Sequence, residues 1–177
     1  MRGGRESHLE QSMQNKIRVR DDDVLIGSSS WEDSLGRLQQ IHGWCLKSPL
    51  VIHVPTILVT EIQQFPNAIE YIKEQTKANK MLPEIHGLRH IDYAKLPVEE
   101  VKEHLKVCKD WINDKMGHLP TKWYTPWGAN APHLYDAAQA EHLELVDCSN
   151  ILKLSGRYGV VQALKDGHDP IKFLLGR

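Results

Sequence analysis

The fold of this chain is decided by residues 16–23, which read Lys-Ile-Arg-Val-Arg-Asp-Asp-Asp. Residues 16–20 alternate polar and apolar side chains, the pattern of a β-strand with two different faces. Three acids, Asp21, Asp22 and Asp23, then close the strand. Neighbouring carboxylates repel one another, so three at one strand end cost stability unless a cation or a proton transfer uses them. The stretch therefore predicts a first strand whose end binds a cation or transfers a proton.

A second motif, His-Gly-Leu-Arg-His at residues 86–90, comes later in the chain. Its two histidines are four residues apart, a spacing that lets both neutral imidazoles reach one metal ion. With one carboxylate they make a 2-His-1-carboxylate set, which leaves positions open for water and substrate. Taken separately, the acids also fit an exposed capping turn, and the histidines fit two unrelated surface residues. Together they support the hypothesis of a metal-dependent hydrolase.

Length and composition limit the function classes. The chain has 177 residues, of which 41% are hydrophobic and 25% charged, as expected for one globular domain. A net charge of -1 gives no electrostatic reason to expect nucleic acid or an anionic membrane as partner. No apolar run approaches the roughly 20 residues that span a bilayer, and residues 1–15 lack the apolar core of a secretory signal. We therefore expect a cytoplasmic protein with a loose leader, residues 1–15, and one domain, residues 16–177.

Strand and helix patterns alternate along the chain. Strands are predicted over residues 16–20, 50–54, 81–85, 121–124 and 143–146, with weaker patterns at 151–154 and 159–164. Helices are predicted to begin near Ser29 and at Pro66, Pro97 and Pro132. The alternation predicts an α/β fold, a parallel sheet or barrel with helices outside. Chemistry in such folds lies at the carboxyl ends of the strands, where the sequence places residues 21–23, 86–90, 125–128 and Asp147.

The order of these motifs resembles that of the polysaccharide deacetylases, carbohydrate esterase family 4, also called the NodB-homology group. That family carries an Asp-Asp pair, a His-x-x-x-His motif, an Arg-x-Pro-x-Gly-type loop, a later Asp and a C-terminal Leu-x-His. The matching stretches here are residues 20–24, 86–90, 123–128 and 145–147. The resemblance covers residues 16–164, most of the chain. It implies an α/β fold, a distorted (β/α) barrel of the polysaccharide deacetylase type.

The resemblance also implies a base and a metal site. Asp22 would be the general base that activates water, and Asp23, His86 and His90 would hold a divalent metal ion, with zinc expected. In a second register, shifted back by one residue, Asp21 becomes the base and Asp22 the ligand. We favour the first register because the apolar strand then runs up to the acid pair, as it does in the family.

The remaining matches concern the substrate. The resemblance assigns substrate contacts to the third motif, Tyr124, Pro126, Trp127 and Gly128, and oxyanion stabilisation to a backbone N–H near Trp127. Asp147 would be the later catalytic Asp. Trp123 and Trp127 would either line a sugar platform or belong to the core. His53, inside an apolar run, would lie either in the core or at the mouth of a barrel.

Two departures from the family pattern stand out. Tyr124 occupies the place of the third motif's arginine, so whatever that arginine orients must be held otherwise. No Leu-x-His follows either, and its histidine is the family's general acid, a role that contributes roughly 10²–10⁴-fold. His168 is the one histidine near the end, and it lies in a predicted polar turn. Three explanations stay open: the natural chain continues past Arg177, another histidine substitutes, or the protein is slow or inactive.

The implied reaction is hydrolysis of an amide C–N bond, the removal of acetyl groups from N-acetylated sugars or glycans, with a carbohydrate as the partner. The first alternative is a catalytically weak or inactive relative that binds carbohydrate or metal. The second is a deacylase that acts on another small-molecule amide or ester.

Overall fold

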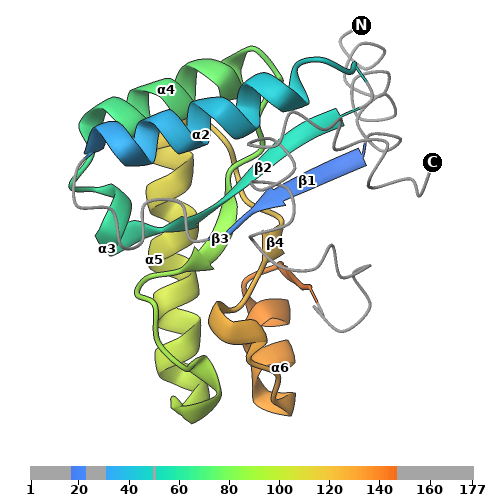
Figure 1. Cartoon of the computed structure of the whole chain (residues 1–177). Helices are drawn as coiled ribbons and strands as arrows, with labels where there is room; N and C mark the ends of the chain where they lie inside the picture. The colour runs from blue at the N-terminus through green and yellow to red at the C-terminus, as the bar shows by residue number, and fades with distance from the viewer. Residues whose placement is uncertain (1–16, 23–30, 50, 147–177) are drawn as a thin grey trace, which may run out of the picture.

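A computed structural model describes residues 17–22, 31–49 and 51–146 of the chain (Figure 1). Its strands form one parallel sheet in the order β1-β2-β3-β4-β5. They are β1 (Ile17–Asp21), β2 (Val51–Leu58), β3 (Glu84–Gly87), β4 (Lys122–Trp123) and β5 (Glu144–Leu145). The predicted alternation of strand and helix is confirmed over these residues. The segments 151–154 and 159–164 lie outside the described residues, as do Asp23, Asp147 and His168.

Helices connect successive strands. They are α2 (Trp31–Cys45), α3 (Val59–Ile62), α4 (Pro66–Lys77), α5 (Val98–Met116) and α6 (Pro132–Ala140), with the short turns η1 (Tyr93–Lys95) and η2 (Pro126–Gly128). Proline opens α4 and α6, as predicted, because the first helical residue needs no N–H partner. Helix α5 ends at Gly117, which adopts φ 70° in the left-handed region. No helix in the described part of the chain is long and apolar enough to cross a membrane.

The strand order itself favours a barrel-type arrangement. Each strand pairs with the next one along the chain, and the order does not reverse. Since parallel crossovers are right-handed, such an order keeps the connecting helices on one face of the sheet, whereas a doubly wound sheet reverses and covers both faces. Figure 1 shows α2 and α4 side by side on that face, with α5 crossing behind the strands. The parallel α/β architecture is thus the predicted one.

The two faces of the sheet pack into separate clusters. The main core joins the sheet to the helices and includes Ile57, Ile85 and Trp123 from the strands. The residues that alternate with them form a second buried cluster, which contains Ile52, Val54, Leu82 and Tyr124. We call the first side the helix face and the second the inner face. The described acids of the first motif, Asp21 and Asp22, divide between these two faces.

Several strand boundaries differ from the predicted ones, most of all those of β2 and β3. Strand β2 runs through Pro55, which pairs with Asp21, and reaches Leu58. Strand β3 begins at Glu84, three residues later than predicted, because Met81 makes only an isolated bridge to His53. His86 therefore lies within β3 itself.

Candidate active site

Asp21 and Asp22 point to opposite faces of the sheet. Asp21 lies on the helix face, 6% exposed, with its Oδ1 3.3 Å from Arg37 Nη2 of α2 and its Oδ2 3.5 Å from His53 Nε2. Successive strand residues alternate in direction, so Asp22 lies on the inner face. His86 lies on that face too, because its neighbour Ile85 belongs to the helix-face core. This placement puts Asp22, and not Asp21, on the face that carries His86.

Both carboxylate oxygens of Asp22 have a partner. The hydroxyl of Thr56 in β2 donates to Oδ1 at 3.0 Å, and Arg20 Nη2 lies 2.5 Å from Oδ2. The Asp22 side chain is 28% exposed. Each carboxylate oxygen has two lone pairs, and a held oxygen therefore keeps capacity to accept a further proton donor. Asp22 is an oriented, accessible carboxylate at the end of β1.

His86 is oriented by a backbone carbonyl. Its ring is 3% exposed, and its Nδ1 lies 2.5 Å from the Tyr124 carbonyl oxygen. A carbonyl only accepts, so Nδ1 carries the proton and the lone pair of the neutral ring is on Nε2. Trp123 Nε1 donates to the carbonyl of His86 at 3.1 Å and anchors the same residue from the core side. Such orientation is typical of a metal-binding histidine.

The loop between the two histidines is packed against Tyr93. The Tyr93 hydroxyl accepts from Leu88 N–H at 2.8 Å, and Thr60 Oγ1 donates to the Leu88 carbonyl at 2.8 Å. A Cβ at Gly87 would lie 2.7 Å from the Tyr93 hydroxyl, so this position admits only glycine without a shift. These contacts fix the loop that carries His90. The two histidines are therefore brought together by a loop and not by a helical turn.

The two imidazoles are spaced to share one ion. The ring centroids of His86 and His90 lie 5.5 Å apart. Two imidazoles that bind one tetrahedral ion through nitrogen at about 2.0–2.1 Å have ring centres roughly 5 Å apart. The expected third ligand, Asp23, is outside the described residues, and within those residues no group of three or more His, Cys, Asp or Glu is arranged to hold a metal. The centroid spacing of two of the three proposed ligands is thus close to this value.

The third motif places Trp127 beside His90. Trp127 is 69% exposed, and its ring packs edge-on against His90 with centroids 4.5 Å apart. Its φ of 54° is rare for a bulky residue and marks strain of the kind that functional sites hold. Trp123, by contrast, is fully buried in the helix-face core. Of the two tryptophans, Trp127 is therefore the one that a ligand reaches.

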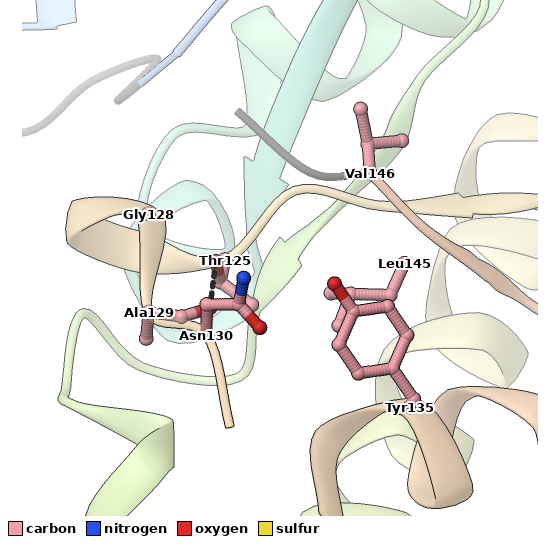
Figure 2. Close-up of a pocket in the computed structure, with 7 residues that line it drawn as sticks. All are labelled: Thr125, Gly128, Ala129, Asn130, Tyr135, Leu145 and Val146. Carbon is pink, nitrogen blue, oxygen red and sulfur yellow. Dashed lines mark hydrogen bonds between the residues drawn. The ribbon is translucent and has the colours of Figure 1, made fainter. Parts of the chain in front are cut away.

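The turn around Trp127 borders a small hollow (Figure 2). Thr125 fixes this turn, since its carbonyl accepts from Gly128 N–H at 3.1 Å and its hydroxyl donates to the Ala129 carbonyl at 2.8 Å. The cavity volume of this hollow is about 10 Å³, barely enough for one water molecule. In Figure 2 the side chains of Asn130 and Tyr135 reach toward it from opposite sides, with Val146 at its edge. Polar groups thus continue beyond the histidines along the carboxyl ends of β4 and β5.

Tyr124 contacts both His86 and Arg20, the residue paired with Asp22. Its carbonyl holds His86, and the guanidinium carbon of Arg20 lies 5.2 Å from the centre of its ring. Burial, with the nearby Glu84 carboxylate, raises the pKa of Tyr124 to about 12. The phenol therefore stays neutral near pH 7, and its ring is the part that Arg20 contacts.

Sequence reasoning missed Arg20, Thr56 and Tyr93. Arg20 had a detectable signal, since it precedes Asp22 by two residues on a strand and must share its face. Thr56 and Tyr93 had none, because their contacts depend on the β1–β2 register and on the conformation of the histidine loop. Pro126 is buried beneath Trp127 in η2, where it fixes the backbone of the turn.

Comparison with known proteins supports the fold. No family model matches the chain, and no curated protein matches it. Solved structures do match: a family 4 carbohydrate esterase from Streptomyces lividans in complex with acetate superposes with a TM-score of 0.55 at 17% identity, covering 75% of this chain and 62% of that one. A family 4 pseudoenzyme from Bacillus anthracis gives a TM-score of 0.56 at 11% identity, with 74% and 42% covered.

A third structure covers more of both chains. The family 4 esterase domain of a multidomain xylanase from the hindgut metagenome of Trinervitermes trinervoides has a TM-score of 0.56 at 14% identity, with 86% of this chain and 67% of that chain covered. The chain spans less than two thirds of the first two proteins, 62% and 42% of their lengths. The chain has the α/β fold of the family 4 carbohydrate esterases, the polysaccharide deacetylases that its motifs resemble.

Proposed function

We propose that this chain carries a metal-dependent deacetylase site that removes acetyl groups from N-acetylated sugars or glycans. The observation that carries the proposal is the His86–His90 pair, with ring centroids 5.5 Å apart, on the same sheet face as the held carboxylate of Asp22. The fold shared with family 4 carbohydrate esterases supports it. The strands also bring these groups to the carboxyl-terminal edge, where α/β folds place their chemistry.

The residues fit a divalent ion, with zinc as the proposed one. His86 and His90 would bind it through imidazole nitrogen, and Asp23 would add a carboxylate. A bound zinc ion supplies Lewis-acid polarisation of the acetyl carbonyl and lowers the pKa of water, effects each worth several kcal/mol. The chain's own contribution is to hold the donors, and the Tyr124 carbonyl does so for His86.

The remaining steps are assigned to side chains and backbone. Asp22 takes a proton from the water that attacks the acetyl carbonyl carbon, and its fixed oxygens keep it aimed. The N–H of Trp127 donates to the oxyanion that develops on the carbonyl oxygen. The C–N bond then breaks, acetate leaves, and the amine nitrogen takes up a proton. We propose Asp147 and His168 as the residues that serve this last transfer. Tyr124, Pro126 and Gly128 shape the substrate side of the loop.

A second function, an inactive or weak carbohydrate- or metal-binding relative, is favoured by two observations. Tyr124 stands in place of the expected arginine, and residues 129–177 contain no Leu-x-His. A similar solved structure is described as a family 4 pseudoenzyme. The same ligands with a slow proton transfer to the amine would give a protein that binds zinc and turns over little.

One set of variants separates these functions. Zinc content and acetate release from N-acetylated chito-oligosaccharides are measured on protein without a histidine tag. Asp22→Asn is expected to keep zinc and lose acetate release by at least 100-fold, since general bases contribute roughly 10²–10⁴-fold. His90→Asn is expected to lose zinc.

Exposed residues of the same types provide the controls. Asp136→Asn and His142→Asn should behave as the wild type in both measurements, because both side chains are exposed. Zinc binding without turnover would favour the binding relative. Zinc content unchanged in His90→Asn would remove the metal assignment.

A further inference from the structure

Arg20 makes two contacts on the inner face that belong together. Its Nη2 lies 2.5 Å from Asp22 Oδ2, and its guanidinium carbon lies 5.2 Å from the ring centre of Tyr124. The first is a charge-assisted contact with the proposed base. The second is a cation–π contact with a ring that is 6% exposed. One guanidinium therefore touches both the carboxylate and the third motif.

The contact with Tyr124 spans the sheet. Strands β1 and β4 are separated by β2 and β3, which puts them roughly 14 Å apart on a flat sheet at about 4.8 Å per strand. The Arg20 side chain therefore extends along the inner face toward β4, with 28% of it exposed. The ring that it meets is packed with Ile52, Val54 and Leu82. A rigid, buried surface thus sets the position of a long and otherwise flexible side chain.

An exposed ion pair by itself is a weak constraint. Such pairs are worth little because ordering two flexible side chains costs entropy. Here the ring of Tyr124 confines the guanidinium, and Thr56 holds the other carboxylate oxygen at 3.0 Å. The pair consequently fixes the plane of the Asp22 carboxylate at low entropic cost.

We propose that Arg20, held by the Tyr124 ring, is the positioning residue for the Asp22 carboxylate. This inference rests on the proposed function, in which Asp22 is the base. It also accounts for the departure at Tyr124. In this chain the cation is Arg20, two residues before Asp22 in the sequence. Tyr124, which replaces the expected arginine, supplies the ring against which Arg20 packs. Tyr124 then orients Asp22 through Arg20 and orients His86 through its own carbonyl.

The kinetic test compares zinc-loaded variants on N-acetylated chito-oligosaccharides. Arg20→Met is expected to lower kcat roughly 10–100-fold, the cost of a misplaced catalytic group, with KM within about twofold and zinc content unchanged. Arg20→Lys should recover part of that loss. Arg18→Met removes the same charge from the same face of β1, where Arg18 is exposed, and should match the wild type. Equal kcat for Arg20→Met and Arg18→Met would overturn the inference.

Tyr124 provides a second arm. Tyr124→Leu should lower kcat as Arg20→Met does. We call the Tyr124–Arg20–Asp22 contacts the clamp; since both changes remove it, the double variant should be no slower than either single one. Tyr124→Phe keeps the ring and should retain at least a third of wild-type kcat. Additive losses in the double variant would contradict the clamp. Thermal unfolding of each variant shows whether Tyr124→Leu remains folded.

A spectroscopic measurement separates this inference from the proposed function. The ring current of Tyr124 should shift the NMR signals of the Arg20 side chain upfield in the wild type and in Tyr124→Phe, but not in Tyr124→Leu. The guanidinium N–H signals should exchange faster with water in Asp22→Asn than in the wild type. If the wild type shows these NMR signatures but neither it nor any variant releases acetate, the proposed function fails and the clamp stands. If the signatures are missing in the wild type, the clamp is wrong whatever the activity.

Discussion

The indole of Trp127 packs edge-on against the imidazole of His90, with ring centroids 4.5 Å apart and planes at 74°. One ring is the most exposed large hydrophobic side chain of its loop, at 69%, and the other is a proposed metal ligand. The contact restricts the orientation of His90 from the solvent side, while the loop anchored on Tyr93 restricts it from within. The third motif therefore contacts a proposed metal ligand as well as forming the proposed substrate loop.

Removing the Trp127 ring should weaken zinc binding. Trp127→Ala is expected to lower zinc affinity about tenfold, the scale on which outer contacts of a ligand act, with little change in melting temperature because the ring is mostly exposed. Trp127→Phe should recover most of the affinity. Competition with a chelating dye measures both, and Tyr135→Ala, another exposed aromatic, is the matched control. A zinc affinity of Trp127→Ala equal to that of the control would show that the Trp127–His90 contact does not contribute to zinc binding.

A methyl group at Gly87 should destabilise the histidine loop. Its Cβ would lie 2.7 Å from the Tyr93 hydroxyl and 2.9 Å from Tyr93 Cε2, so Gly87→Ala is expected to cost roughly 1–3 kcal/mol in unfolding free energy. Gly36→Ala, in the exposed interior of α2 with nothing within 4 Å, should instead stabilise by roughly 0.5–1 kcal/mol. Urea unfolding compares the two. Similar effects from both substitutions would refute the packing account of this loop.

Glu84 should be needed for the junction of β3 and β4. This carboxylate is 1% exposed and accepts from the backbone N–H groups of Thr121 and Lys122 at 2.9 and 2.8 Å. Glu84→Ala removes a buried acceptor shared by two backbone donors and should cost roughly 2–4 kcal/mol. Glu144→Ala, which removes a mostly exposed partner of Lys122, should cost under about 1 kcal/mol. Chemical denaturation gives both values, and comparable losses would mean that the Glu84 contacts are not structural.

Acid should destabilise the protein through His42. Burial, with His53 close by, lowers the pKa of His42 from 6.5 to about 4. Between these values the unfolded chain binds a proton that the folded one does not, so the contribution is complete above pH 6.5 and is lost as pH falls toward 4. Its size is roughly 2–3 kcal/mol.

The slope of stability against pH isolates that residue. Unfolding free energies of the wild type and of His42→Leu are compared from pH 7 to pH 4. The variant should show a shallower decline over this range, whatever its stability at pH 7. His142→Leu, at an exposed position, should keep the wild-type slope. Identical slopes in all three proteins would exclude His42 as an acid-sensitive group.

Much of the frame follows from sequence pattern. The alternation at Ile17–Asp21 determines that Asp21 and Asp22 face opposite sides, and the proline and glycine positions locate α4, α5 and α6. The site is less predictable because it depends on contacts between distant segments. Thr56 reaches Asp22 only in the observed strand register, and the 5.5 Å separation of the histidine rings depends on a loop shaped by Tyr93. The four-residue spacing indicates that the two histidines lie together, but no local pattern encodes the strand register or the contacts of this loop with Tyr93.

Zinc-dependent acetate release from an N-acetylated chito-oligosaccharide tests the central claim most directly. Protein stripped with a chelator is assayed before and after zinc is returned in measured amounts. The account predicts no release from the stripped protein, and release that rises with zinc and levels off at about one ion per chain, as one mononuclear site requires. Release that is equal with and without zinc, or none at any zinc level, would contradict it.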